Sequence, residues 1–229
     1  MKRFGLTNNQ LKIIAMVAML LDHVGRELLP QWTWMIVVGR LAFPIFAYMI
    51  AEGCLYTKHK VQYILMIAGL ATVCQGAYFF ATGSLYQNVL VTFTLSIGLI
   101  FVIERFLDKP DVASGAILAA VLTGVVALCI LLPRKTNGEF VIDYGLVGVL
   151  LPVTVRFARE KWEKLTCTAV MLVLLAMTMF SLQWYGLLAL PLLALYNGQR
   201  GKWKLKYLFY IFYPAHLLVI HLVQMLIFG

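Results

Sequence analysis

Long apolar segments run along almost the whole chain, and charges, glycines and prolines separate them. An apolar segment of about 20 residues crosses the hydrocarbon core of a bilayer as one helix. Taking each break as a boundary predicts about nine membrane-spanning helices. Their expected bounds are 11–29, 34–56, 61–81, 88–107, 112–132, 144–158, 165–181, 184–198 and 205–227. The pattern therefore predicts an all-α, polytopic membrane helix bundle that forms a single integral membrane domain over residues 1–229.

Composition supports this interpretation. Hydrophobic residues make up 62% of the chain and charged residues only 13%, with a mean hydropathy of +0.87. A soluble domain contains about half apolar residues and has no means of burying more. The lipid bilayer is therefore the expected surrounding of most side chains.

Positive charges of membrane proteins concentrate in cytoplasmic segments. With the N-terminus inside, only Arg26, Arg134 and Lys135 fall in outer segments, and Arg40 falls within a span. Every other lysine and arginine then falls in a cytoplasmic segment. We expect a cytoplasmic N-terminus and a multi-pass protein of the cell (cytoplasmic) membrane. Topology also explains the net charge of +9 without a nucleic-acid partner.

Several chemistries have no motif in the chain. The four cysteines are widely and irregularly spaced, which is not the pattern of a zinc or redox site. HExxH, GxSxG and Walker-type sequences are also absent, as is a carboxylate-rich metal cluster. We expect no metal, and no hydrolysis through a metal or a serine nucleophile.

The first predicted helix carries Asp22 and His23 side by side within apolar sequence. Ionisable groups are costly inside a bilayer, so such a pair indicates a functional site. Lys12 precedes His23 by eleven residues, which puts both on one helix face with a rise of about 16 Å between them. Arg40 enters the bilayer to a similar depth, with Pro44 expected to kink the helix below it. Asp22 and Arg40 then form either part of a reactive site or a structural ion pair between two helices.

Further polar residues are weaker candidates. The basic cytoplasmic rim is explained by topology alone, or it holds a polyphosphate-bearing donor together with Lys12. The candidates for that rim are Lys58, Arg156, Arg159 and Lys206. The candidates for substrate contacts near the outer half are Asn88, Asp143, Tyr213 and His216.

Five sequence runs resemble the TraX family, in the same order and over nearly the whole chain. They are LKIIAMVAMLLDHVG, GRLAFPIFAYMIAEG, NVLVTF, DYGLVGVLLP and LFYIFYPAHLLVIHL. That family is associated with N-terminal acetylation of conjugative pilin, and it resembles membrane acyltransferases of the acyltransferase-3 type. Their first helix carries a basic residue, ten further residues and a histidine, which Lys12 and His23 match with lysine in place of the usual arginine. The resemblance implies acetyl-CoA as donor, with the histidine near the thioester.

We therefore expect a His-dependent acetyltransferase that carries acetyl groups from cytoplasmic acetyl-CoA to an extracytoplasmic acceptor. His23 is the expected general base, and Asp22 orients the imidazole or stabilises its charged form. Arg40 steadies Asp22 or stabilises the oxyanion. The acceptor is an amine or hydroxyl of a peptide, glycan or lipid head group. The alternative is a proton-coupled transporter in which Asp22, His23 and Arg40 form a gate.

Overall fold

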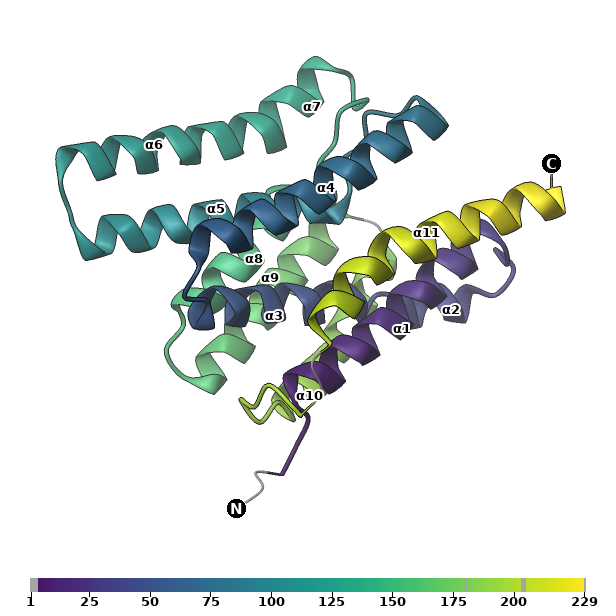
Figure 1. The fold of residues 1–229 in the computed structure, drawn as a ribbon, viewed down its shortest axis with the longest axis horizontal. Coiled ribbons are helices and arrows are strands. Elements are labelled where there is room, and N and C mark those ends of the chain that lie inside the picture. Colours follow the sequence, from purple (N-terminus) through teal and green to yellow (C-terminus); the bar gives the residue numbers. More distant parts are fainter. Residues whose placement is uncertain (1–3, 180, 203–204, 229) are drawn as a thin grey trace. The chain divides into compact units, whose positions relative to one another are not determined.

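The computed structural model describes residues 4–179, 181–202 and 205–228, and every regular element in these ranges is a helix (Figure 1). The chain forms two compact units. Unit 1 contains Met1–Met49 and Thr168–Gly229, and unit 2 contains Ile50–Cys167. Two helices, α3 (Ala42–Tyr56) and α9 (Lys161–Thr178), contribute residues to both units.

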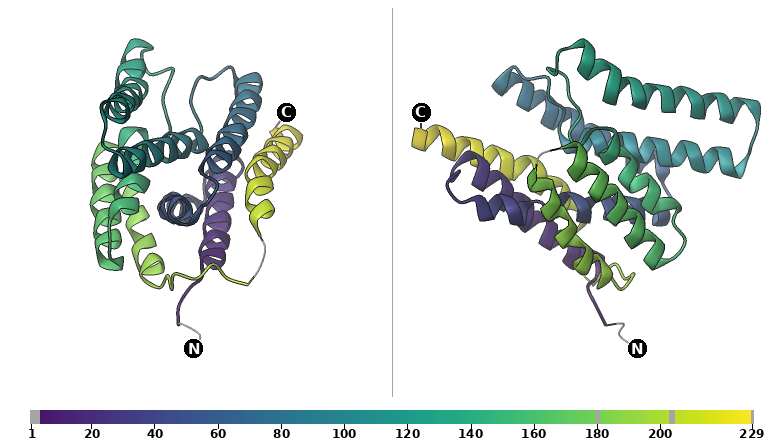
Figure 2. Two further views of the ribbon diagram at one scale, coloured as in Figure 1. Left: turned by 60° about the vertical axis from the view of Figure 1, so that its left-hand side comes forward. Right: turned by 180° about the vertical axis from the view of Figure 1, so that it is seen from behind.

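Unit 1 is built around α1 (Asn8–Glu27), which packs against α2 (Thr33–Gly39) and α11 (Lys206–Phe228) (Figures 1 and 2). The 3₁₀-helix η2 (Ser181–Leu188) and α10 (Ala189–Ala194) complete it. Helix α1 begins at Asn8 because Thr7 and Gln10 form a capping box, in which each side chain bonds to the other's backbone N–H.

Unit 2 contains α4 (Lys60–Thr82), α5 (Val89–Asp108) and α8 (Gly145–Phe157), with α5 packed against both of the others. The Ser96 hydroxyl donates a 2.8 Å hydrogen bond to the Val149 carbonyl and joins α5 to α8. The chain then continues from α5 into a long apolar arm that returns beside it (Figures 1 and 2). This arm contains α6 (Val112–Val126), the π-helix η1 (Ala127–Leu131) and α7 (Leu132–Lys135).

The predicted all-α fold is confirmed for the described residues. Within the described ranges, five helical stretches are long and apolar enough to cross a membrane. They are Thr33–Tyr56, Lys60–Thr82, Val89–Asp108, Val112–Lys135 and Tyr210–Ile227. Five is fewer than the nine predicted crossings, because the other predicted spans form helices that are shorter or more polar.

Two predicted spans are interrupted. The predicted span 184–198 is not one α-helix, since it consists of the end of η2, the short α10 and the turn that follows Ala194. The predicted span 34–56 breaks at Arg40 and Leu41, between α2 and α3, which agrees with the kink expected from Pro44 because proline has no N–H to donate to the Arg40 carbonyl four residues earlier. Pro44 lies in the first turn of α3, where a missing backbone N–H costs no helical hydrogen bond.

Candidate functional site

A buried ion-pair cluster joins α1 to the end of α2. One carboxylate oxygen of Asp22 accepts a hydrogen bond from the Arg40 guanidinium, and the other accepts a 2.9 Å bond from Nε of Arg26. The Arg40 side chain is only 6% exposed, whereas that of Arg26 is 46% exposed. The predicted pairing of Asp22 with Arg40 is therefore confirmed, and Arg26 completes the cluster.

Gly39 makes this close approach of the two helices possible. A Cβ atom at this position would contact Asp22, and would lie only 2.8 Å from its Cα. Because that neighbour is partly backbone, the helices themselves would have to separate. We expect Gly39→Ala to lower the free energy of unfolding by about 1–3 kcal/mol, as overpacking does. Thermal unfolding in detergent measures this loss. Gly69→Ala on α4 is the control, because a Cβ atom there meets no atom within 4 Å. Equal losses of stability in the two variants would contradict the packing role of Gly39.

His23 is held by its own helix. Its Nδ1 lies 2.8 Å from the Met19 carbonyl oxygen. A carbonyl only accepts hydrogen bonds, so Nδ1 carries the proton and Nε2 of the neutral ring keeps its lone pair. The expected orienting role of Asp22 therefore belongs to Met19, because both carboxylate oxygens of Asp22 receive guanidinium donors instead.

His216 of α11 lies against His23, with ring centroids 5.0 Å apart and planes at 79°. Its Nδ1 lies 2.8 Å from the Phe212 carbonyl oxygen, which repeats the arrangement of His23. Phe212 stacks on the His216 ring at 4.8 Å, and Tyr213 approaches its edge at 5.6 Å. Among the described residues, the buried Nε2 of His216 has no hydrogen-bond partner. Two predicted substrate residues, Tyr213 and His216, thus lie at the predicted base.

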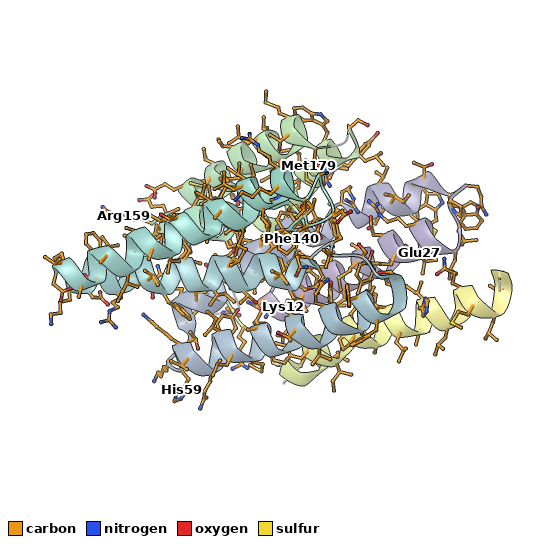
Figure 3. The ribbon with its side chains drawn as sticks, turned by 90° about the horizontal axis from the view of Figure 1, so that it is seen from above. Lys12, Glu27, His59, Phe140, Arg159 and Met179 are labelled. Atoms are coloured by element: carbon orange, nitrogen blue, oxygen red, sulfur yellow. The ribbon has the colours of Figure 1, made fainter. Side chains whose placement is uncertain are left out.

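A basic group lies at the opposite end of α1. The segment after α10 runs beside the start of this helix, where backbone N–H groups of Asn8 and Asn9 donate to Gln199 and Arg200 at 2.8 and 3.2 Å. This brings the Arg200 charge into electrostatic range of Lys12. Figure 3 labels Lys12 and Glu27 toward the two ends of α1.

Three of the other residues predicted to bind the acetyl-CoA donor, Lys58, Arg156 and Arg159, belong to unit 2. Arg156 and Lys60 each form an ion pair with Glu104, at 2.6 Å to one carboxylate oxygen and 2.6 Å to the other. Lys58 and Arg159 are exposed residues of unit 2. Lys206 is the first residue of α11 in unit 1, and its side chain lies outside the described residues.

Asn88 and Asp143 make hydrogen bonds in the loops that precede α5 and α8 of unit 2. The Asn88 side chain caps α5 by accepting from the Leu90 N–H at 3.0 Å, and donates to Gln75 at 3.0 Å. Asp143 accepts a 2.6 Å hydrogen bond from the Tyr86 hydroxyl. Both predicted substrate residues therefore lie in unit 2, apart from the residues of unit 1 that surround His23.

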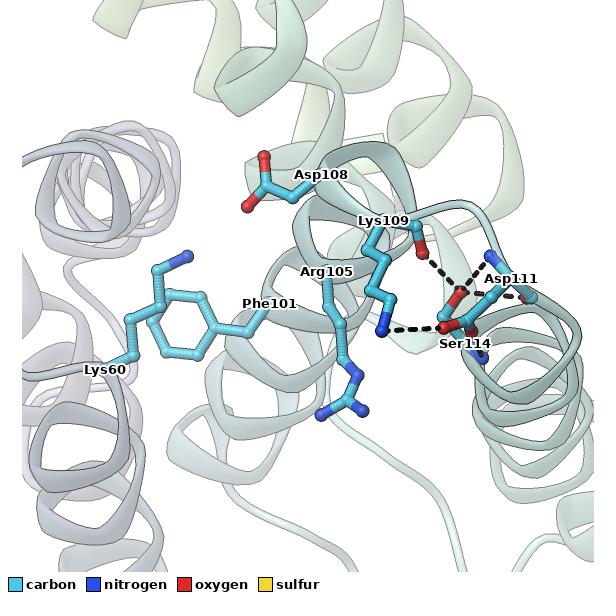
Figure 4. Close-up of a pocket in the computed structure, with 7 residues that line it drawn as sticks. All are labelled: Lys60, Phe101, Arg105, Asp108, Lys109, Asp111 and Ser114. Carbon is cyan, nitrogen blue, oxygen red and sulfur yellow. Dashed lines mark hydrogen bonds and ion pairs between the residues drawn. The ribbon is translucent and has the colours of Figure 1, made fainter.

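Unit 2 also contains an open pocket of about 380 Å³ (Figure 4). Its lining includes three cations and two carboxylates, so their charges largely cancel. The residues are Lys60, Phe101, Arg105, Asp108, Lys109, Asp111 and Ser114. Asp111 caps α6, and the N–H of Ser114 lowers the pKa of this carboxyl below its usual range. The mixed charge does not favour a polyphosphate here.

Comparison with known proteins bears on the arrangement around α1. The profile of the TraX protein family matches residues 7–224, which include both histidines of the pair and the Asp22 cluster. The chain belongs to the TraX family.

Three known proteins are similar in sequence to this chain. A probable fimbrial assembly protein FimC of Dichelobacter nodosus, serogroup H1, is 26% identical over 91% of both chains. Protein TraX of Escherichia coli K12 is 30% identical over 71% of this chain and 61% of its own length. An uncharacterized Rickettsia prowazekii protein is 39% identical over 26% of this chain and 24% of its own. No solved structure matches the chain.

The sequence analysis did not identify three groups that take part in these contacts. Arg200 was one cation among many in the basic segments, and only the backbone pairing with α1 distinguishes it. Glu104 is a carboxylate inside the apolar α5, the same signal that identified Asp22. The Met19 carbonyl, which orients His23, has no signature in the sequence, since any residue supplies the same backbone oxygen.

Proposed function

We propose that this chain is a membrane-embedded acyltransferase that uses acetyl-CoA from the cytoplasmic side. Its acceptor is an amine or hydroxyl presented on the extracytoplasmic side, and the chain crosses the membrane about nine times with the N-terminus inside. The observation that supports this best is the anchoring of His23, whose Nδ1 donates to Met19 and whose Nε2 is therefore the basic atom. A base held in a single tautomer is what general-base catalysis requires.

The proposed reaction conserves every atom and proton. The acceptor nitrogen or oxygen attacks the thioester carbonyl while Nε2 of His23 removes its proton. The carbon–sulfur bond then breaks, the acetyl group stays on the acceptor, and the sulfur leaves as the thiolate. The same proton is then transferred to that sulfur, which yields free CoA thiol. Acetyl-CoA is consumed as a co-substrate, and no metal enters the reaction.

Arg40 acts in this proposal through Asp22. Its guanidinium donates to that buried carboxylate, so the two charges neutralise each other one residue before His23. The cluster thereby fixes the turn of α1 that carries the base. This arrangement favours steadying of Asp22 over direct stabilisation of the oxyanion.

The Lys12–Arg200 end of α1 is the proposed contact for the phosphates of CoA. We expect Arg200→Gln to weaken acetyl-CoA binding about tenfold, because a charge-assisted hydrogen bond contributes about 1.5–3 kcal/mol. S-acetylpantetheine lacks the nucleotide and should bind equally to both proteins. Calorimetry with the two thioesters measures this, and Lys202→Gln on a neighbouring exposed residue is the matched control. Equal losses for both thioesters would contradict a phosphate contact.

The decisive experiment follows free thiol release from acetyl-CoA by purified protein in detergent, with and without a cell-envelope extract. Release that requires the extract supports acyl transfer to an envelope acceptor. The name of the Dichelobacter relative, a probable fimbrial assembly protein, makes a fimbrial subunit peptide the first defined acceptor to add. Absence of release, together with proton flux in vesicles that contain no CoA thioester, would favour the transporter in which Asp22, His23 and Arg40 form a gate.

A further inference from the structure

His23 and His216 of unit 1 are held by the same kind of hydrogen bond, although a mechanism with one general base requires only one such histidine. Each donates from Nδ1 to the carbonyl four residues earlier on its own helix, at 2.8 Å. Each neutral ring therefore keeps its lone pair on Nε2. The rings lie 5.0 Å apart, and the Nε2 of His216 is buried with no hydrogen-bond partner in the described residues. A buried acceptor without a donor is costly, which calls for a function.

Charge repulsion limits how many protons this pair holds. Two imidazolium ions about 5 Å apart at an effective dielectric constant of about 20 repel strongly enough to weaken the second proton on the order of 100-fold. Stacking of Phe212 on the His216 ring adds no compensating negative charge. The pair is thus suited to holding a single proton.

Few other groups around the pair compensate a second proton. The nearest carboxylate in sequence, Asp22, already pairs with Arg26 and Arg40. The titratable and charged residues described on the helices in contact, beyond that cluster, are Lys12, Glu27, Tyr210, Tyr213 and His221. Glu27 lies one turn of α1 beyond His23, but its side chain is exposed and receives a 3.4 Å hydrogen bond from Gln224.

We propose that His23 and His216 form one proton-holding pair, in which the two Nε2 atoms take up a single proton between them and His216 relays it during acyl transfer. This inference rests on the proposed function for its second half only. His23 removes the proton from the acceptor, His216 receives it, and His216 delivers it to the leaving CoA sulfur. The proton removed from the acceptor is the one that appears on the thiol, so the relay leaves both rings neutral.

Titration of the histidines tests the pair without any activity. The chain has four histidines, so ¹⁵N-histidine labelling gives a spectrum that single His→Gln variants assign completely. We expect both paired rings to carry hydrogen on Nδ1 at high pH, and to titrate in two macroscopic steps as pH falls. In His216→Gln, His23 should titrate in one step, and in His23→Gln, His216 should do the same.

His221→Gln is the matched control for these measurements. This residue lies on the same helix as His216 but is exposed. Its replacement should leave the two-step titration of the pair and the rate of thiol release unchanged.

Activity tests the relay. We expect His216→Gln to lower the rate of thiol release at least tenfold while acetyl-CoA binding stays within twofold of wild type. In the wild type the rate should fall at both low and high pH, and in His216→Gln it should fall on one side only, because one of two coupled groups has been removed. A purely structural role of His216 would leave the shape of that profile unchanged.

The outcomes separate this inference from the proposed function. One-step titration of both rings in the wild-type protein overturns the pair, whether or not either variant folds. Two-step titration with an unchanged pH–rate profile in His216→Gln overturns the relay. Two-step titration in a wild-type protein that releases no thiol overturns the acyltransferase and leaves the proton pair standing.

Discussion

We expect His23→Ala to lower the rate of acetyl-CoA-dependent thiol release by about 10²–10⁴-fold, the range that a positioned general base contributes. In the proposed mechanism Nε2 of His23 takes the acceptor's proton, and alanine supplies no base. Acetyl-CoA binding should remain, since the phosphates are assigned to the opposite end of α1. The measurement is thiol release at saturating acetyl-CoA with envelope extract, together with calorimetric binding.

His59→Ala is the control for this experiment. His59 is an exposed residue that precedes α4 in unit 2, so its loss should leave the rate unchanged. His23→Gln distinguishes lost basicity from lost volume, because glutamine fills similar space without an ionisable nitrogen. A folded His23→Ala protein that retains full activity would remove His23 from the mechanism.

The sequence predicted the Asp22–Arg40 contact because burying charge is expensive. Asp22 and Arg40 were each conspicuous in apolar segments, and a buried charge requires a partner of opposite sign. Counting residues along α1 then placed both at a similar depth. This argument uses only local spacing and one rule of electrostatics, and the ion pair confirms it.

The same reasoning did not predict contacts between residues that lie far apart in the chain. His216 lies almost the full length of the chain from His23, and nothing in α1 specifies which turn of α11 meets it. Glycine at position 39 allows the helices to approach, but its importance appears only with Asp22 beside it.

Arg40→Met should lower the free energy of unfolding by about 3–5 kcal/mol, because it leaves the buried Asp22 carboxylate with one partner that is half-exposed. Arg26→Met is the matched control. Arg26→Met also removes a hydrogen bond to the Asp22 carboxylate, but the Arg26 donor is exposed. It should lower the free energy of unfolding by less than about 1 kcal/mol. Chemical and thermal unfolding in detergent measure both, and equal costs would contradict the dominance of the buried bond.

The double variant Asp22→Asn/Arg40→Met separates the two interpretations of this cluster. Removing both charges together eliminates the unpaired carboxylate, so stability should recover most of what Arg40→Met loses. If thiol release recovers with stability, the ion pair serves only to join α1 and α2, and any neutral pair that holds the turn before His23 is sufficient. If stability recovers while thiol release stays low, the charges themselves act on the reaction. The first result is the one we expect, because the paired charges of Asp22 and Arg40 neutralise each other and the cluster acts by fixing the turn of α1 that carries His23.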